Sequence, residues 1–455
     1  MQQPNVKTLA EAKKLVSEQN LSHAKVAVTD IDGILRGKYI SKEKLTDAME
    51  NGFGFCDVIL GWDCNDQLYN NSGHTGWHTG FPDALVKPIP QTCRSIPWEN
   101  ETLFFLAEFI GAAQTICPRN ILKKVISKAT SMGCFALAAA EYEFFLFDET
   151  PETVREKKFH NLTPYTPGNF GYSIIRNTVN SDFHNDLLEM CETMGFPIEG
   201  YHTETGPGVI EAALKVDEIL AAADKAVLFK TFTKVLAQKN NLMATFMAKW
   251  SMDHPGQSGH IHISLTDRKG KSIFHDSQKQ NSISDTMRWF IGGQQRLLSD
   301  FMALVAPTIN SYTRLVPGLW APTNNSWGID NRTCSLRVIP GSPSSQRVEY
   351  RLGSADSNPY LSMAAALASG LWGIENKVEP GSPVHGNSYQ NKTNGLEDLP
   401  KTLQDSVTTL KKSTPARLYL GSDFVDHYSA TREWEIAEYR RQVTDWQMNR
   451  YFEII

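Results

Sequence analysis

Hydrophobic and polar residues alternate strictly in three segments of the chain, which predicts three strands that each carry one charged face. The segments are 140–147 (AEYEFFLF), 259–263 (GHIHI) and 347–351 (RVEYR). Because side chains at i and i+2 share a face of a strand, Glu141 and Glu143 point the same way, opposite to the intervening apolar residues. Adjacent carboxylates repel each other and buried unpaired charge is costly, so we expect a cation between them. The pattern therefore predicts one charged cavity lined by a sheet.

The remaining periodicity predicts helices mixed with hairpin-paired strands. Helices are expected at 2–19, 120–132, 216–240, 290–306, 359–376 and 422–450. Further strands are expected at 25–30, 34–40 and 102–109, the first two joined by the turn signal Asp32-Gly33. Gly111 and Pro118 punctuate the chain and suggest two domains, 1–112 and 113–455. This arrangement favours the α+β class.

Composition excludes several function classes. A chain of 455 residues is long enough for two domains. A net charge of -5, from 45 basic and 50 acidic residues, argues against a general nucleic-acid binder. No apolar run is long enough to span a membrane. The seven cysteines are scattered without a CxxC pair, which is typical of reduced thiols in a cytoplasmic protein and makes sulfur-bound zinc a poor candidate.

Carboxylates outside the first strand can join the same cavity. Glu204 and Glu211 flank a Gly-Pro-Gly bend, which allows both to return to one site. With two residues of the other alternating strands, the candidate metal ligands are Glu141, Glu143, Glu204, Glu211, His260 and Glu349. Oxygen-rich ligation with one imidazole suits two Mg²⁺ or Mn²⁺ ions. The alternative is that these acids are solvated charges at strand edges.

Arginines are concentrated in one part of the sequence. They are Arg314, Arg332, Arg337, Arg347 and Arg351. The guanidinium fork matches carboxylate and phosphate, so the cluster implies a polyanionic substrate such as a nucleoside triphosphate and favours phosphoryl transfer. A structural salt-bridge network is the alternative. Neither a Walker motif nor a kinase-type glycine loop is present.

Five segments resemble, in order, motifs of the glutamine synthetase superfamily, and the length is similar to the bacterial type I enzymes. They are 141–147, 314–318, 331–337, 347–351 and 358–361, within a similarity that covers residues 26–452. The resemblance implies a β-grasp N-terminal domain and a large catalytic domain with a curved antiparallel sheet. It also implies a homo-oligomer, a dodecamer of two stacked hexamers, with active sites between subunits.

The resemblance implies a role for each candidate residue. The first metal would be bound by Glu143, Glu204 and Glu211, and the second by Glu141, His260 and Glu349. Glutamate would be held by Arg314, Arg351 and the backbone of Gly256. The phosphates of ATP and the phosphoryl group in transfer would face Arg332, Arg337 and Arg347, with Ser264 near the base.

The reaction implied by the resemblance joins the γ-carboxylate of glutamate to an amine through γ-glutamyl phosphate, with ATP as the phosphoryl donor. Asp63, supplied by the neighbouring subunit, would help to deprotonate the amine, and Asp66 is its rival because the loop has no clean register. A non-catalytic relative is disfavoured because all six candidate ligands are present. A guanido kinase-like chemistry is disfavoured because the glutamate motifs also match.

One position departs from the family pattern. Trp320 stands where ammonia-using enzymes carry a glutamate that helps to bind ammonium. An indole suits an alkyl or aryl group better than a small cation, although a cation–π contact is also open to it. We therefore hypothesise a γ-glutamylamide ligase that prefers an organic primary amine. The alternative is a glutamine synthetase that uses ammonia, with Trp320 as a packing variant; the sequence leaves the identity of the amine open.

Overall fold

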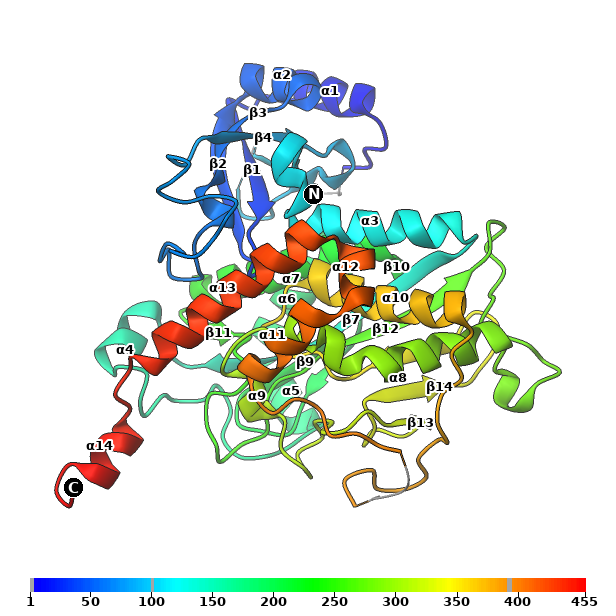
Figure 1. Ribbon diagram of the computed structural model, residues 1–455. Helices are drawn as coiled ribbons and strands as arrows, with labels where there is room; N and C mark the ends of the chain where they lie inside the picture. The colour runs from blue at the N-terminus through cyan, green and yellow to red at the C-terminus, as the bar shows by residue number, and fades with distance from the viewer. Residues whose placement is uncertain (1–3, 100–101, 391–394) are drawn as a thin grey trace.

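The computed structural model describes residues 4–99, 102–390 and 395–455. Two sheets follow each other along the chain (Figure 1). The elements of the first part are α1 (Leu9–Glu18), β1 (His23–Thr29), β2 (Leu35–Ser41), α2 (Lys42–Asn51), β3 (Phe53–Cys56), η1 (Asp57–Leu60), β4 (Asp83–Pro88), η2 (Pro90–Thr92), β5 (Arg94–Ser95), β6 (Leu103–Phe109) and η3 (Gly111–Thr115). The predicted helix 2–19 is shorter than expected, and its residues 2 and 3 lie outside the described residues.

The N-terminal sheet has the strand order β2-β1-β6-β4-β3, with β5 also paired to β6. Strands β1 and β2 form the expected antiparallel hairpin, and β1 runs parallel to β6. Asp30 closes the hairpin, because one of its carboxylate oxygens accepts the backbone N–H groups of Asp32 and Ile34. The hairpin prediction is confirmed, since an aspartate that caps its own turn is a local signal.

The second part of the chain forms the larger sheet and its helices. The elements are α3 (Pro118–Ser131), β7 (Phe135–Phe147), α4 (Pro151–Glu156), α5 (Ile174–Val179), α6 (Ser181–Thr193), β8 (Ile198–Thr203), β9 (Val209–Leu214), β10 (Asp217–Glu218), α7 (Ile219–Lys239), β11 (Met243–Thr245), β12 (Gly259–Thr266), η4 (Gln280–Ser282), α8 (Asp285–Val305), α9 (Ser311–Arg314), β13 (Trp327–Ile329), β14 (Leu336–Ile339), β15 (Arg347–Tyr350), α10 (Pro359–Asn376), α11 (Leu403–Lys412), α12 (Thr414–Leu420), α13 (Ser422–Arg440) and α14 (Asp445–Tyr451).

This sheet has the order β13-β14-β15-β12-β7-β9-β8, with β10 and β11 also paired to β7. All pairs are antiparallel except β13 with β14. The long helices pack on one face: Tyr142 and Phe144 on the back of β7 pack against Phe229 of α7, and α3, α8 and α10 continue this layer (Figure 1). The opposite face is therefore free to carry the charged side chains. The expected α+β class is confirmed.

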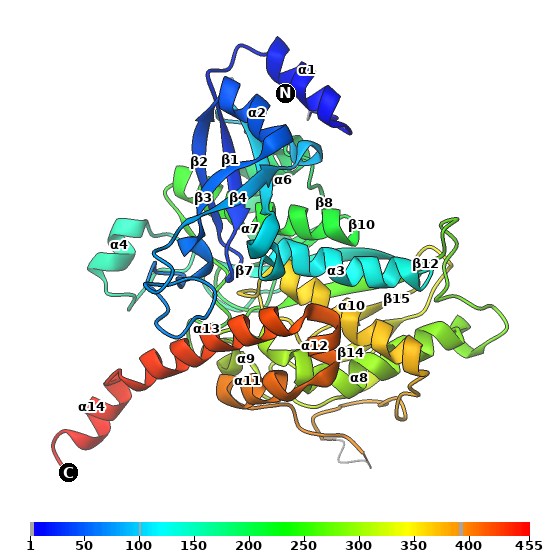
Figure 2. The same ribbon diagram turned by 45° about the horizontal axis from the view of Figure 1, so that its top comes forward.

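The C-terminal stretch 422–450, expected to be mostly helical, forms two helices. Helix α13 ends at Arg440, and α14 starts at Asp445 behind a capping box formed by Thr444 and Gln447. Both views show α14 standing away from the body of the molecule (Figures 1 and 2). No helix in the described ranges has the length and apolar content needed to cross a membrane.

Candidate active site

The register of the larger sheet brings the predicted acids together. On β7, Glu141 lies opposite His260 of β12, and Glu143 lies opposite Glu211 of β9. The Glu143 carboxylate also accepts the backbone N–H of Ser258 at 2.5 Å. Because the strands are antiparallel and their backs are apolar, these side chains project from the face opposite the long helices.

Glu349 on β15 is the most strongly paired acid of the face. Arg337 donates to it at 2.9 Å and Arg351 at 2.5 Å. His260 Nδ1 lies 3.1 Å from Glu141 Oε1 and 3.4 Å from Glu349 Oε1. Burial would raise the pKa of Glu349, but Arg351 and the neighbouring imidazoles hold it at about 2. Glu349 is therefore held in its ionised form by cations of its own chain.

One group of three side chains has the spacing of a metal site. Its members are Glu141, His262 and Glu349, whose candidate ligand atoms lie within 4.8 Å of one another. The predicted ligands include His260 but not His262, although the alternation at 259–263 places both imidazoles on one face. His260 Nε2 is buried without a hydrogen-bond partner in the described structure. Both imidazoles are thus candidates for the second metal.

The first predicted metal site contains a histidine, His202, that is not among the predicted ligands. His202 on β8 lies opposite Glu211, with Nε2 3.0 Å from Glu211 Oε1 and Nδ1 3.7 Å from Glu204 Oε2. Tyr172 stacks on this imidazole with ring centroids 4.2 Å apart. The signal was present, because His202 alternates with Glu204. Burial raises the pKa of Glu211 to about 8, with a further contribution from Glu141 and Glu143. This face has more acid than its own cations neutralise, so the residues fit a divalent metal.

A cavity of about 840 Å³ opens over this face. Its lining includes Glu141, Glu143, Glu204, Glu211, His260, Ser264, Arg332, Arg337, Arg347, Glu349 and Arg351. Arg347 reaches inward, donating from Nε to His262 Nδ1 at 3.2 Å. The volume lies in the range of small-molecule sites.

A second cavity of about 50 Å³ adjoins the first. Its lining combines acids, arginines and apolar side chains: Glu143, Glu204, Val209, Pro255, Gly256, Arg314, Leu319, Trp320 and Arg351. Arg314 is buried and donates to the carbonyls of Arg351 and Leu352, each at 3.2 Å. A Cβ at Gly256 would come within 2.7 Å of Arg314 Cγ, so only glycine lets the backbone pass this close to the guanidinium stem.

Comparison with known proteins identifies the family. Residues 115–451 match the family described as glutamine synthetase, catalytic domain. The chain belongs to the glutamine synthetase family. It is 47% identical over 437 residues to Type-1 glutamine synthetase 2 of Dictyostelium discoideum, covering 95% of this chain and 84% of that protein. It is 34% identical over 459 residues to glutamate–isopropylamine ligase of Pseudomonas sp, covering 100% of both.

A solved structure, the GmaS/ADP complex, has the same fold. The TM-score is 0.85 at 25% sequence identity, covering 97% of this chain and 99% of that chain. Related proteins are named ligases and synthetases, so the expected family, fold class and enzyme class are confirmed.

In this member of the glutamine synthetase family, Trp320 lies on the loop between the two cavities. It lines both cavities, its side chain is 58% exposed, and its backbone has φ of +60°. The left-handed region is strained for a bulky residue, at a cost of about 1–3 kcal/mol. The loop thus holds an indole at the border between the cavities.

The two aspartates considered for amine deprotonation lie outside both cavities. Asp63 and Asp66 belong to a loop of the N-terminal sheet, and neither of them lines either cavity. The roles assigned to individual residues, Asp63 included, stay predictions, as do the domain limits 1–112 and 113–455.

Proposed function

We propose that this protein is an ATP-dependent ligase that joins the γ-carboxylate of glutamate to an organic primary amine, in preference to ammonia. In the first step the γ-carboxylate attacks the terminal phosphorus of ATP, giving γ-glutamyl phosphate and ADP. In the second step the amine attacks the acyl phosphate, forming the γ-glutamylamide and releasing phosphate.

The charged face supports the first step. Divalent ions bound there would neutralise negative charge on the phosphates. Their ligands would be Glu143, Glu204 and Glu211 on one side, and Glu141, Glu349 and an imidazole of β12 on the other. Arg337 and Arg347 line the same cavity, and the exposed Arg332 lies at its edge. Such fixed positive charge stabilises the phosphoryl group during transfer.

Glutamate is assigned to the smaller cavity. Arg314 and Arg351 provide the positive charge for its carboxylates. Gly256 and Ser258 lie on the same wall, where the backbone closely approaches Arg314. A dicarboxylate amino acid matches two guanidinium groups better than a monocarboxylate would.

Trp320 is the observation that favours an organic amine. Its half-exposed indole borders the smaller cavity together with Val209, Pro255 and Leu319. Apolar and aromatic surface rewards an alkyl or aryl substituent, which ammonia lacks. The relatives named glutamate–isopropylamine ligase, gamma-glutamylethanolamide synthetase and gamma-glutamylputrescine synthetase are consistent with this choice.

Ammonia is the second candidate, because the relative at 47% identity is named a type-1 glutamine synthetase. Glu143 and Glu204 also line the smaller cavity and offer negative charge to a small cation.

The test is ADP release with glutamate, ATP and Mg²⁺ or Mn²⁺, measured with ammonia and a panel of primary amines at matched free-base concentration. We expect one alkyl or aryl amine to give turnover far above ammonia. Ammonia as the best substrate would establish the second candidate, and no turnover with any amine would overturn both.

A further inference from the structure

Arg314 is a buried cation that forms no ion pair with an acid of the described chain. Its Nη1 and Nη2 each donate to one backbone carbonyl. Burial lowers the pKa of Arg314 to about 10, although the charges of Glu143 and Asp356 act in the opposite direction. Because the guanidinium has more N–H groups than these carbonyls use, Arg314 can still bind a carboxylate in the smaller cavity, which it lines.

Arg314 is the last residue of the short helix α9, so contacts at the start of α9 act on the position of its guanidinium. At this start, Oδ2 of Asp356 accepts the hydroxyl groups of Thr308 and Ser311, each at 2.8 Å. Each of these hydroxyls also accepts the backbone N–H of the other residue at 3.1 Å. Both hydroxyl protons are therefore directed at Asp356, whose oxygen closes the turn that begins α9.

The segment 351–356 contacts the guanidinium of Arg314 as well as the start of α9. Its first two carbonyls accept from the guanidinium, each at 3.2 Å, and Asp356 lies at its other end. The backbone N–H of Ala355 donates at 3.1 Å to the carbonyl of Gln257, which belongs to the wall of the smaller cavity. One segment thus relates the position of α9 to that of the cavity.

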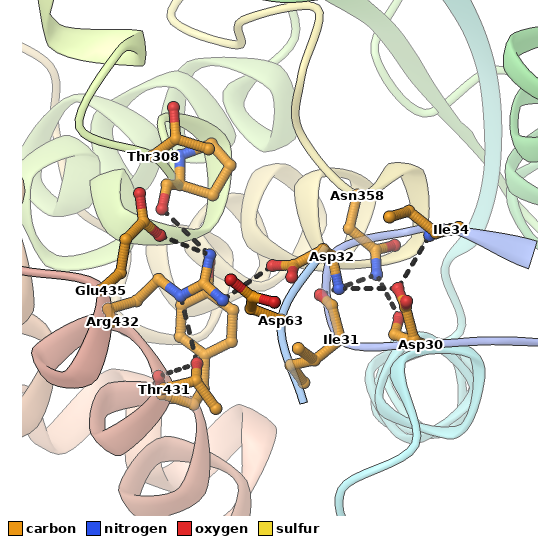
Figure 3. Close-up of polar contacts among 12 residues, drawn as sticks. Asp30, Ile31, Asp32, Ile34, Asp63, Thr308, Asn358, Thr431, Arg432 and Glu435 are labelled. Carbon is orange, nitrogen blue, oxygen red and sulfur yellow. Dashed lines mark hydrogen bonds and ion pairs between the residues drawn. The ribbon is translucent and has the colours of Figure 1, made fainter. Parts of the chain in front are cut away.

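Helix α13 contacts the backbone of the same turn. Arg432 donates to the carbonyl of Pro307 at 3.1 Å, and Glu435 accepts the backbone N–H of Ile309 at 3.0 Å. Figure 3 shows the guanidinium of Arg432 between Glu435 and Asp32. These contacts hold the chain before α9, whereas the carboxylate of the segment 351–356 binds the first residue of α9 itself.

Asp356 differs from the paired acids of the molecule because hydroxyl groups take the place of a guanidinium. Its Oδ1 accepts the hydroxyl of the buried Ser354, and no lysine or arginine of the described chain forms an ion pair with it. The carboxylate therefore keeps its charge and can act on Arg314 through the geometry of α9 or through attraction alone. Hydrogen bonds fix a direction and attraction at a distance does not, so experiment can separate the two.

We propose that Asp356 is a positioning residue for the acid substrate: it fixes the start of α9 so that Arg314 presents its remaining N–H groups to a carboxylate of glutamate. This inference rests on the proposed function. Asp356 lines neither cavity, so it acts through Arg314 and not on the substrate directly. Arg314 lines the smaller cavity but not the larger one, so nucleotide binding should not depend on Asp356.

The test measures by calorimetry the Kd of glutamate in the presence of Mg²⁺ and ADP, and the Kd of ADP with Mg²⁺. Thr308→Val removes one hydroxyl and leaves the charge of Asp356, so we expect the Kd of glutamate to rise about tenfold, as for the loss of one hydrogen bond. Asp356→Ala should raise it about 10- to 100-fold, because a displacement of about 1 Å is felt on this scale. The Kd of ADP should stay within about twofold in both variants.

Thr313→Val is the matched control. It removes an exposed hydroxyl of the same helix, whose partner is the carbonyl of Asn310, and should leave both Kd values unchanged. Asp356→Asn loses the charge but keeps a side-chain oxygen for the two hydroxyls, so it should bind glutamate more tightly than Asp356→Ala.

A double-mutant cycle separates positioning from a general structural role. Arg314→Lys keeps a cation but lacks the directional fork of the guanidinium. If Asp356 acts through that fork, Asp356→Ala should change the Kd of glutamate by no more than about twofold in the Arg314→Lys background.

Equal losses of glutamate and ADP affinity would overturn the inference, and so would additive effects in the cycle. Wild-type affinity for glutamate in both Thr308→Val and Asp356→Ala would also overturn it. A loss in Asp356→Asn as large as in Asp356→Ala, with normal binding in Thr308→Val, would overturn it in favour of charge. In each of these cases the proposed function stands. A wild-type protein that binds ADP but not glutamate would instead remove the proposed function itself, and the inference with it.

Discussion

The charged face of the larger sheet and the junction around Arg432 both concentrate charge, but they balance it in opposite ways. On the sheet, Glu349 has two arginines, whereas Glu141 lies beside the imidazoles of His260 and His262, and Glu204 and Glu211 share the imidazole of His202. At the junction the two acids of the hairpin turn each have a guanidinium: Asp30 pairs with Arg36, and Asp32 pairs with Arg432, the second pair being drawn in Figure 3.

This difference separates a site from a structural contact. Acids that are paired with arginines of the same chain are already neutralised, and these pairs join the N-terminal part to α13. Charges that remain in excess under an open cavity require a cation from outside. Substitutions in the two regions should therefore have opposite signatures in activity and in stability.

The largest effect on activity is expected for Glu211→Gln. The amide keeps the shape but removes one ligand, so amide formation should fall by more than about 10²-fold, the scale of losing one electrostatic contact to the transition state. The metal-free protein should gain up to about 1 kcal/mol in its free energy of unfolding, because a buried acid no longer faces Glu141 and Glu143. Enzyme assays and urea unfolding in a chelator measure the two quantities. A large loss of metal-free stability would contradict the comparison.

Arg432→Met should show the reverse signature. It leaves the partly buried Asp32 without its cation and the buried hydroxyl of Tyr69 without its donor, so the free energy of unfolding should fall by about 3 kcal/mol. Arg288→Met, whose partner is exposed, should cost no more than about 1 kcal/mol. Urea unfolding at one pH gives both values. Similar small losses in the two variants would show that the junction charges are effectively solvated.

The sequence predicted the charged face well because its signal is local. Strict alternation at 140–147, 259–263 and 347–351 identified the strands, and the apolar backs identified the face. Local signals also exist for two features that are absent from the predictions. His202 alternates with Glu204, and a capping box at Thr444 marks the start of α14.

Other features have no local signal. Which imidazole meets Glu141 depends on strand register, which only the folded sheet defines. Arg432 and Asp32 are separated by 400 positions, and nothing near either residue indicates the partner. The left-handed backbone of Trp320 follows from the packing of its loop and not from its residue type. The contact of Glu141, the Arg432–Asp32 pair and the backbone of Trp320 all depend on tertiary structure.

A moderate effect on specificity is expected for Trp320→Glu, which adds one more acid to the face that already has an excess. The ratio of kcat/KM for the preferred alkylamine to that for ammonia should fall by about tenfold or more, the usual scale for changing one wall of an apolar pocket. Trp320→Phe should keep the preference. Trp446→Glu, an exposed indole on α14, is the control for the added charge alone. An unchanged ratio in Trp320→Glu would favour the packing role of the indole and the use of ammonia.

The smallest expected effect is the pH dependence of the free energy of unfolding that arises from His427. His427 of α13 is buried against Ser72, and burial, with a further contribution from His74, lowers its pKa to about 3. Below the ordinary histidine pKa, His427 binds a proton in the unfolded chain but not in the folded chain. The free energy of unfolding therefore decreases as pH falls, by at most about 1.4 kcal/mol per pH unit. Urea unfolding at pH 7.5 and 5.5 should show a smaller loss for His427→Gln than for the wild type. His160→Gln, at an exposed position, should keep the wild-type slope, and the same slope in His427→Gln would mean that protons reach this junction without unfolding it.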